Sequence, residues 1–428
     1  MRNIISILTL IILATSTSAI TPKPAAKQTE EVVYHNAVIH LGNGEVLNNA
    51  TIAFQNGKIT RVGYFKMKWQ PTDIDLKGKH VYPGFILPNT TLGISEIGSI
   101  KATNDSREVG QMNPNVRSIV AYNTDSEITP TLRYNGILMA QSTPQGGLVS
   151  GLSSIVQLDA WNWEDAAVVV DDAVHVNWPS LMRAKFDYST YTMKVEKNKQ
   201  YDKQIDQIKS LFKDSKLGVH RQNGKINLKL KTVNPVFSGN RQVFIHTNDP
   251  KAIIESINYF KKEGIERIVL VSQQGTLPVK DFIKASGVPV IVSGTHAMPK
   301  RDDSSVDAGY TTAIKLNQAG ILTALGYQGT MSSRNLAFTA GTLVSYGMKK
   351  EQALKLITSN TAKILGIDQS YGTLENGKSA TLIVTEGDAL DMKGNILVDA
   401  YIDGRKLNLD GRQQILDKRF MEKYNLDK

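Results

Sequence analysis

The chain has 428 residues, a formal net charge of +10 and no cysteine. Its length allows a large buried core, and its composition is that of an ordinary globular protein. The lack of cysteine excludes a disulfide framework. Between Lys194 and Lys231 there are eleven Lys or Arg residues against four Asp or Glu. Apolar residues recur there at helical spacing, so the excess predicts the solvated face of a helix, and we expect no nucleic-acid partner.

The N-terminus has the parts of a secretory signal peptide. Arg2 precedes a short apolar run, and small residues follow it up to Ala19. The apolar run is short for a bilayer span. We predict a signal peptide over 1–19, with an uncleaved anchor as the alternative, and a flexible leader over 20–31. The protein is therefore expected to be exported, to a periplasm.

β-rich segments lie at both ends of the remaining chain. Residues 32–63 contain an Asn-Gly pair of the kind that type I′ hairpins need, and residues 381–402 show a similar pattern of strands and turns. We predict one small β-sandwich formed by both ends. Its N-terminal part would cover 32–82, and its C-terminal part with a tail would cover 367–428.

Strand and helix patterns alternate in the middle of the chain. A glycine stands before several of the strands, where the end of a helix is expected. Such units imply a parallel sheet, and the pattern alone leaves a closed barrel and an open sheet as equal alternatives. The strand candidates from the pattern are residues 84–87, 137–141, 167–170, 243–247, 267–271, 288–292 and 321–325.

One segment connects this pattern to a known family. Residues Tyr82 to Gly93 read Y-P-G-F-I-L-P-N-T-T-L-G. This resembles the signature P-G-h-I-D-x-H-x-H-x-G of the amidohydrolase superfamily. Residues 353–384 are similar to the closing helix of imidazolonepropionase-like amidohydrolases and to its return to the β-domain. The resemblance implies an α/β fold: a (β/α)8 TIM-type barrel over 83–366 beside the β-sandwich.

The resemblance also places the expected metal site, and most of its ligands are replaced. Family members use histidines on strands 1, 5 and 6 and an aspartate on strand 8, whereas here only strand 5 keeps its histidine, His246. Some family members also have a lysine or glutamate ligand on strand 4. Here strand 4 is expected at 228–233, where Lys229 and Lys231 are equal candidates for that position. We interpret His246 as a metal ligand. A structural role is the equal alternative, because catalytic zinc usually has three protein ligands and His246 would supply only one.

Neutral polar residues stand at or near the replaced positions. Neutral oxygens bind zinc weakly but form hydrogen bonds with a polar substrate. We therefore predict a degenerate metal site with zinc, manganese or no metal, and we assign no catalytic residue. A drifted, hydrated cavity is the equal alternative to substrate binding. The predicted substrate-binding residues are Asn89, Thr91, Ser272, Gln273, His296 and Gln328.

Two functions remain open. The first is an exported hydrolase that acts on non-peptide carbon–nitrogen bonds of a small amide-type substrate with a reduced metal site. The second is a catalytically impaired member that binds a ligand or supports an intact homologous subunit. The expected partners are a small-molecule substrate and either a second copy of the chain or a homologous amidohydrolase.

Overall fold

The computed structural model describes residues 23–65, 70–218, 221–222, 224–298, 304–327 and 329–426. The predicted signal peptide over 1–19 therefore lies outside the described residues. Among the helices of the described ranges, none is long and apolar enough to cross a membrane.

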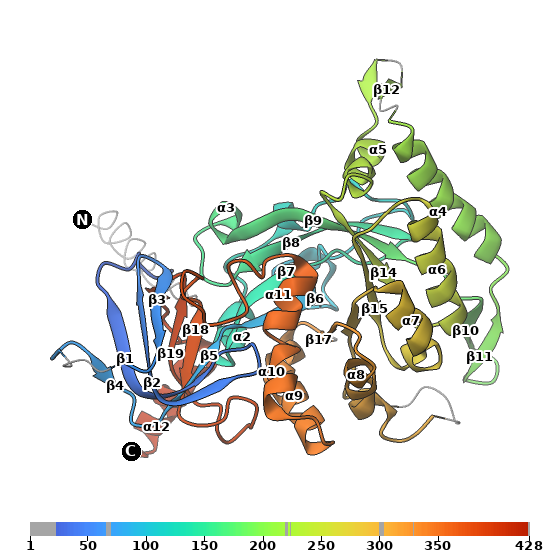
Figure 1. Ribbon diagram of the computed structural model, residues 1–428. Coiled ribbons are helices and arrows are strands. Elements are labelled where there is room, and N and C mark those ends of the chain that lie inside the picture. The colour runs from blue at the N-terminus through green and yellow to red at the C-terminus, as the bar shows by residue number, and fades with distance from the viewer. Residues whose placement is uncertain are drawn as a thin grey trace, which may run out of the picture.

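Two eight-stranded sheets form the framework, and Figure 1 shows them next to each other. The first is built from both chain ends and consists of β1 (Val32–His40), β2 (Val46–Gln55), β3 (Lys58–Gly63), β4 (Ile74–Asp75), β5 (His80–Pro83), β18 (Leu382–Thr385), β19 (Leu397–Ile402) and β20 (Arg405–Lys406). The second forms the barrel and consists of β6 (Phe85–Thr90), β7 (Ile137–Ser142), β8 (Val149–Gln157), β9 (Ala167–Asn177), β14 (Gln242–His246), β15 (Ile268–Ser272), β16 (Val290–Val292) and β17 (Thr323–Leu325).

The first sheet joins the two chain ends through the pairing of β5 with β18. The expected hairpin is present between β2 and β3, where Asn56 and Gly57 have φ values of 51° and 78°. Positive φ at both central residues is the requirement of a type I′ turn. All the described strands of this region belong to one continuous sheet. The structure thus supports a β-sheet formed by both chain ends, which is coarser than the predicted sandwich.

The barrel sheet is not a regular alternation of parallel strands and helices. Strand β8 runs antiparallel to both of its neighbours, β7 and β9, while the other neighbouring pairs are parallel. No long helix separates β7 from β8 or β8 from β9, because residues 143–148 form a short connection and α3 (Trp163–Ala166) has one turn. The predicted (β/α)8 regularity is wrong in this part, since antiparallel neighbours need no crossover helix.

The two end strands of this sheet, β6 and β17, are connected by the backbone of a neighbouring segment. The Ile86 N–H donates to the carbonyl of Ile357 at 2.9 Å, and the Leu325 N–H donates to the carbonyl of Leu356 at 2.9 Å. Residues 356–357 thus accept one backbone N–H from each end strand, and these groups would otherwise lack a strand partner. The barrel is nearly closed in this way.

Helices cover the outside of the barrel, mainly around its second half (Figure 1). The α-helices other than α3 are α2 (Thr129–Tyr134), α4 (Tyr201–Lys216), α5 (Leu228–Val233), α6 (Pro250–Lys262), α7 (Lys280–Ser286), α8 (Ala308–Gln318), α9 (Leu336–Ser345), α10 (Lys350–Lys355), α11 (Ser359–Leu365) and α12 (Arg412–Lys423). The 3-10 helices are η1 (Lys101–Thr103), η2 (Ser118–Ala121), η3 (Asn234–Val236), η4 (Gln274–Val279) and η5 (Met331–Asn335). Two small ribbons project from the body: β10 (Met182–Asp187) with β11 (Thr192–Lys197), and β12 (Arg221–Gln222) with β13 (Lys225–Ile226).

Two predictions for the middle of the chain have opposite outcomes. Residues 201–216 form the predicted amphipathic helix, α4, which buries Ile205, Ile208 and Phe212. Residues 228–233 were expected to be strand 4, and they form helix α5 instead. The Asn227 side chain accepts hydrogen bonds from the first free N–H groups of α5, and such a cap favours a helix over the strand that the alternating pattern indicates. Lys229 and Lys231 are therefore not on a barrel strand.

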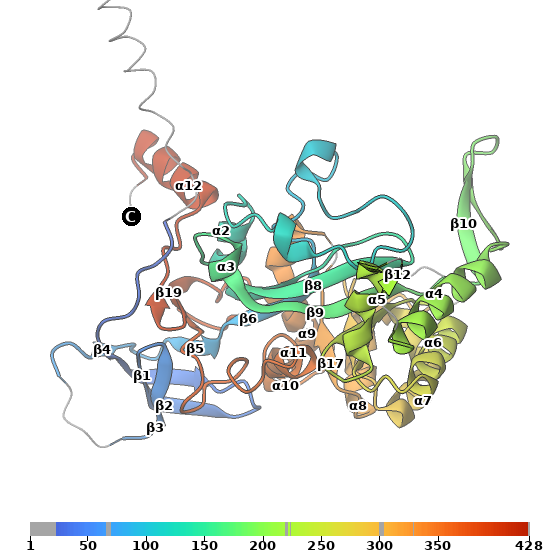
Figure 2. The same cartoon turned by 90° about the horizontal axis from the view of Figure 1, so that it is seen from above.

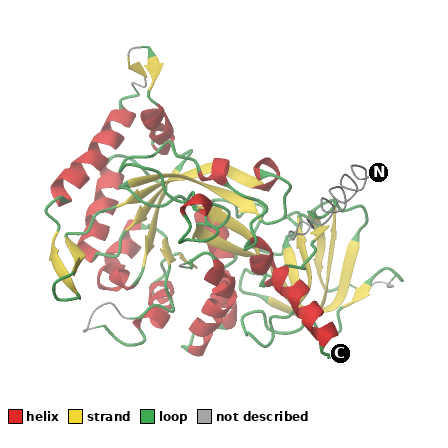
Figure 3. Ribbon diagram, turned by 180° about the vertical axis from the view of Figure 1, so that it is seen from behind, coloured by secondary structure: helices red, strands yellow, loops and turns green. Residues whose placement is uncertain are grey.

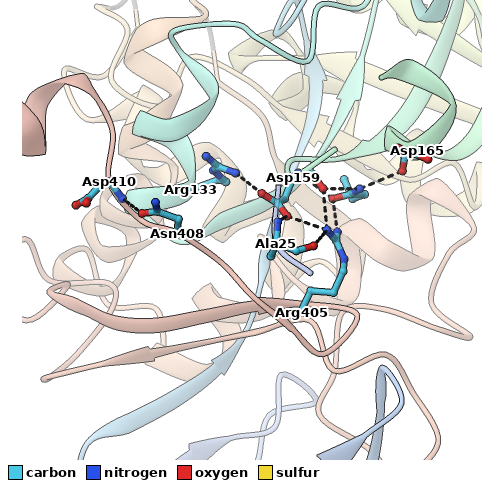
Figure 4. A network of polar contacts seen from close by, with 8 residues as sticks. Ala25, Arg133, Asp159, Asp165, Arg405, Asn408 and Asp410 are labelled. Atoms are coloured by element: carbon cyan, nitrogen blue, oxygen red, sulfur yellow. Dashed lines mark hydrogen bonds and ion pairs between the residues drawn. The ribbon is translucent and has the colours of Figure 1, made fainter. Parts of the chain in front are cut away.

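A buried carboxylate connects the barrel to both chain ends (Figure 4). Asp159 accepts hydrogen bonds from Arg133 at 2.6 Å, from Arg405 at 2.8 Å and from the backbone N–H of Ala25 at 2.9 Å. The Asp159 side chain is fully buried. Gln28 makes further hydrogen bonds with the backbone of Phe54 and Gly57. Residues 23–31 of the predicted flexible leader are thus held against the fold by contacts that their composition did not indicate.

We expect Asp159→Asn to lower the free energy of unfolding by about 3–5 kcal/mol, because two guanidinium groups would lose their buried counter-charge. Urea unfolding followed by circular dichroism measures this effect. The matched control is Asp281→Asn, whose carboxylate is exposed and pairs with Lys280, and for which a change within about 0.5 kcal/mol is expected. Equal effects of the two substitutions would contradict the role given to Asp159.

Candidate active site

A cavity of about 420 Å³ opens at the carboxyl ends of the barrel strands. This is the end at which sites of barrel enzymes are found. The lining residues come from the ends of β6, β14 and β15 and from the loops that follow β6, β7, β14, β15, β16 and β17. They are Asn89, Thr90, Thr91, Gln145, His246, Thr247, Asn248, Val271, Ser272, Gln273, Ser293, Tyr327 and Gly329.

The end of β6 is shaped by an unusual backbone conformation. Asn89 has a φ of 53°, in the left-handed region that asparagine tolerates better than most side chains. Its N–H donates to Oε1 of Gln141 at 3.1 Å, so the distorted strand end is held from β7. Thr91 then reaches across the gap between the end strands of the barrel, and its hydroxyl lies 2.7 Å from that of Thr330. These contacts place Asn89 and Thr91 at the cavity.

His246, which lines the cavity, contacts the buried His175 behind it. Nδ1 of His175, on β9, lies 2.8 Å from Nε2 of His246, at the end of β14. Nε2 of His175 is buried and has no hydrogen-bond partner. An unpaired N–H costs more than an unpaired lone pair, so the proton between the rings belongs on Nδ1 of His175, which donates to His246.

Both histidines are uncharged at neutral pH. Burial lowers the pKa of His246 to about 4. Burial and the neighbouring His246 ring lower the pKa of His175 well below its usual range. With Nε2 accepting from His175, the other ring nitrogen of neutral His246 carries a proton. His246 is thus a neutral hydrogen-bonding group of the cavity wall.

Asn248 organises the wall between β14 and β15. Its side-chain oxygen accepts hydrogen bonds from the backbone N–H of Gln273 at 3.1 Å and of Gly275 at 2.9 Å, and from the hydroxyl of Ser272 at 3.3 Å. Gly275 lies against the Asn248 backbone so closely that a Cβ there would be 1.8 Å from the carbonyl oxygen. The loop is thereby fixed with Ser272 and Gln273 at the cavity.

A buried carboxylate lies inside the barrel without lining the cavity. Asp172 accepts hydrogen bonds from Ser153 at 2.6 Å and from Nε2 of Gln141 at 2.7 Å. Burial raises the pKa of Asp172 to about 6, although these hydrogen bonds act in the opposite direction. Since Gln141 also supports Asn89, the carboxylate contributes to the shape of the cavity through one intervening side chain.

The side chains present do not fit a catalytic metal centre of the usual kind. Zinc in such centres has three protein ligands, commonly histidine nitrogens and carboxylates. Among the residues of the described ranges, no group of three or more His, Cys, Asp and Glu side chains could hold a metal ion. Nε2 of His246 already forms a hydrogen bond with Nδ1 of His175. His246 as a metal ligand therefore remains a prediction that the geometry does not support.

The structure brings together five of the seven site residues predicted from the sequence. Asn89, Thr91, His246, Ser272 and Gln273 all line the cavity. His296 lies instead in adjoining recesses, one of which shares Tyr327 with the cavity, and its Nε2 is 2.9 Å from the hydroxyl of Thr342. Gln328 lies outside the described residues.

Sequence reasoning missed several residues of the site. His175, Gln145, Asn248 and Ser293 either line the cavity or contact residues that do. His175 had no local signal, because its position beside His246 follows only from the pairing of β9 with β14. Gln145 had none either, because it lies in the loop between β7 and β8, which no strand or helix pattern covers.

Comparison with known proteins decides the family. The sequence pattern of the amidohydrolase family matches residues 169–410, which is more than half of the chain. The chain belongs to the amidohydrolase family. This confirms the resemblance seen in the segment from Tyr82 to Gly93 with a match that lies entirely outside that segment. Amidohydrolases act on carbon–nitrogen bonds and usually bind a divalent metal, which makes the neutral cavity unusual for the family.

Individual relatives match only parts of the chain. The imidazolonepropionase of Flavobacterium psychrophilum is 32% identical over 127 residues, which cover 27% of this chain and 31% of that protein. The 5-methylthioadenosine/S-adenosylhomocysteine deaminase of Teredinibacter turnerae is 28% identical over 172 residues, which cover 36% of this chain and 38% of that protein. The matches thus span about a third of the length of these amidohydrolase relatives.

Solved amidohydrolase structures share the fold over most of the chain. An amidohydrolase from Thermotoga maritima superposes with a TM-score of 0.75 at 21% identity, over 88% of this chain and 99% of that one. Molinate hydrolase superposes with a TM-score of 0.52 at 13% identity, over 89% of this chain and 95% of that one. These likenesses support a TIM-type barrel, and at such low identity they show the fold alone.

The buried carboxylate of Asp172 predicts that the stability of the protein depends on pH. The pKa of Asp172 in the folded protein, about 6, exceeds that of an unfolded chain, so its contribution to stability is present at low pH and lost as the pH rises through 6. We expect the stability of the wild type relative to Asp172→Asn to fall by about 3 kcal/mol between about pH 4 and pH 7. Chemical unfolding at several pH values measures it, and parallel curves would contradict the assignment.

Proposed function

We propose that the barrel cavity binds a small, uncharged, amide-type molecule and that the protein is an exported hydrolase acting on a non-peptide carbon–nitrogen bond of that molecule. The observation that carries the proposal is the neutral character of the cavity. Among the lining residues that the structure describes there is no Asp, Glu, Lys or Arg, and His246 is neutral because burial lowers its pKa to about 4.

A neutral cavity favours a neutral ligand. An ion that enters such a site loses its hydration without gaining a counter-charge, whereas an amide can exchange its water contacts for hydrogen bonds with hydroxyl and amide side chains. Asn89, Ser272 and Gln273 offer both donors and acceptors. A carbonyl oxygen could accept from them or from His246, which would orient and polarise the group that the family's chemistry acts on.

Membership in the amidohydrolase family supports the hydrolase half of the proposal. The described side chains include too few metal ligands for a usual catalytic centre, so the proposal contains no metal-dependent step. The support for export is the signal-peptide pattern of residues 1–19. The acid or base of the reaction has no candidate among the described lining residues other than His246 and Tyr327.

The same observation supports a second candidate function. A cavity whose described lining has no carboxylate is suited to binding without turnover, as in a member that holds a ligand or assists a catalytically intact homologous subunit. The two candidates share the ligand class and differ in whether the ligand is consumed.

We expect hydrolysis of at least one compound in a panel of acyl amino-acid amides and cyclic amides, with kcat/KM reduced at least about tenfold by His246→Ala or by Gln273→Leu, since each removes one hydrogen bond at the cavity. Gln352→Leu is the matched control, because Gln352 is exposed on α10. Product formation is measured by chromatography, and metal content by elemental analysis of the same samples.

The remaining outcomes separate the two candidates. Saturable binding without product, weakened by Gln273→Leu and unchanged by Gln352→Leu, would replace the hydrolase with the ligand-binding protein. A stoichiometric metal ion that is lost in the His246→Ala variant would show that His246 is a metal ligand. Neither binding nor turnover across the panel would contradict both candidates.

A further inference from the structure

The ribbon of β10 and β11 stands away from the body of the protein (Figure 2). It belongs to neither of the eight-stranded sheets. The tyrosines at its tip are among the most exposed apolar side chains, with 79% of Tyr188 and 81% of Tyr191 accessible. An isolated two-stranded ribbon is marginally stable in water, so an exposed apolar ribbon of this kind indicates a binding partner.

One face of this ribbon is apolar. In the cross-strand register Phe186 pairs with Met193, and Met182 and Val195 lie on the same face. All four side chains are exposed. The Phe186 ring also contacts the Tyr188 ring, with centroids 5.0 Å apart. The apolar surface therefore continues from the strands to the tip.

The charges of the ribbon are predominantly positive. Residues 182–197 contain four basic side chains and two acidic ones. The pairs Arg183–Glu196 and Lys194–Asp187 form salt bridges. Lys185 lies directly opposite Lys194 and adds a like charge beside the Lys194–Asp187 pair, so this part of the ribbon keeps a net positive charge.

Helix α12, near the C-terminus, has the same combination of properties. None of its twelve residues, all of which the structure describes, is buried. Phe420 is 50% exposed, and Tyr424, just after the helix, is 59% exposed. Residues 412–423 contain four basic side chains against two acidic ones. The helix is held by its first turn, where the Thr131 hydroxyl donates to Gln413 at 2.9 Å.

The two elements point to the same side of the molecule. In Figure 2 both α12 and the ribbon extend toward the top, from opposite ends of the protein. Figure 3 shows α12, next to the C-terminus, lying in front of the body when the protein is seen from behind. Two apolar and basic projections far apart in the sequence thus face one surface.

We propose that this side of the protein binds the surface of an anionic lipid bilayer. A flat, negatively charged surface can contact both projections at once, whereas a second copy of the chain would bring together two positively charged faces. Aromatic side chains favour the boundary between lipid headgroups and acyl chains. Lys185 and Lys194 lie two residues from the end of the ribbon strands, about 7 Å along the strand, where they reach the phosphates when the tip is inserted.

The test is sedimentation of the full chain with vesicles of phosphatidylcholine with and without phosphatidylglycerol. We expect binding to the anionic vesicles, weakened by salt, and reduced at least about tenfold in the variant that combines Tyr188→Ser, Tyr191→Ser, Phe420→Ser and Tyr424→Ser. Tyr346→Ser is the matched control, because Tyr346, directly after α9, is 45% exposed. All variants have the same apolar N-terminal segment, so differences in vesicle binding between them arise from the substituted residues of the ribbon and α12.

A second pair of variants tests the charges without removing apolar surface. Lys185→Gln with Lys194→Gln should reduce the preference for anionic vesicles, because two of the four basic side chains of the ribbon are then removed while those of α12 remain, and Lys185→Arg with Lys194→Arg should keep it. Unchanged binding of the tyrosine and phenylalanine variant, with its fold verified by circular dichroism, would overturn the proposal. So would dissociation of an oligomer by the same substitutions in ultracentrifugation, which would assign the surface to a second copy.

Discussion

The cavity depends on the way the barrel is closed. Strands β6 and β17 do not pair, and the carbonyls of Leu356 and Ile357 accept the N–H groups of Leu325 and Ile86 in place of a neighbouring strand. This arrangement brings the two strand ends close enough for the hydroxyls of Thr91 and Thr330 to lie 2.7 Å apart. Without it, Asn89 and Thr91 would lie at a free sheet edge and would not face His246.

Within this frame the cavity lies at the carboxyl ends of the barrel strands, and its described lining carries no formal charge. The polar groups of the wall are hydroxyls, amides and one neutral imidazole. They are held by partners below the surface: His175 behind His246, Gln141 behind Asn89 and Asn248 beside Ser272. Supporting contacts of this kind fix side chains for binding, and they indicate a cavity that has retained a defined shape.

Much of the fold could be predicted from the sequence. The strand ending at His246 and the Asn-Gly hairpin follow from local patterns that tertiary contacts reinforce. Strand β8 was missed because its buried residues include Ser153 and Ser154, whose small polar side chains give no apolar periodicity. Residues 228–233 alternate like a strand, and the cap from Asn227 overrides the pattern. His175 acquires its place only when β9 and β14 pair, which no local pattern reveals.

The most direct test of the neutral cavity is calorimetric titration with matched ligands, an acyl amino-acid amide and the corresponding acyl amino acid, which differ in one charge. The account predicts that the uncharged amide binds at least about tenfold more tightly than the carboxylate at neutral pH, because the described lining of the cavity offers no counter-charge. His246→Ala should weaken the binding of the amide. Equal or tighter binding of the carboxylate would contradict the account.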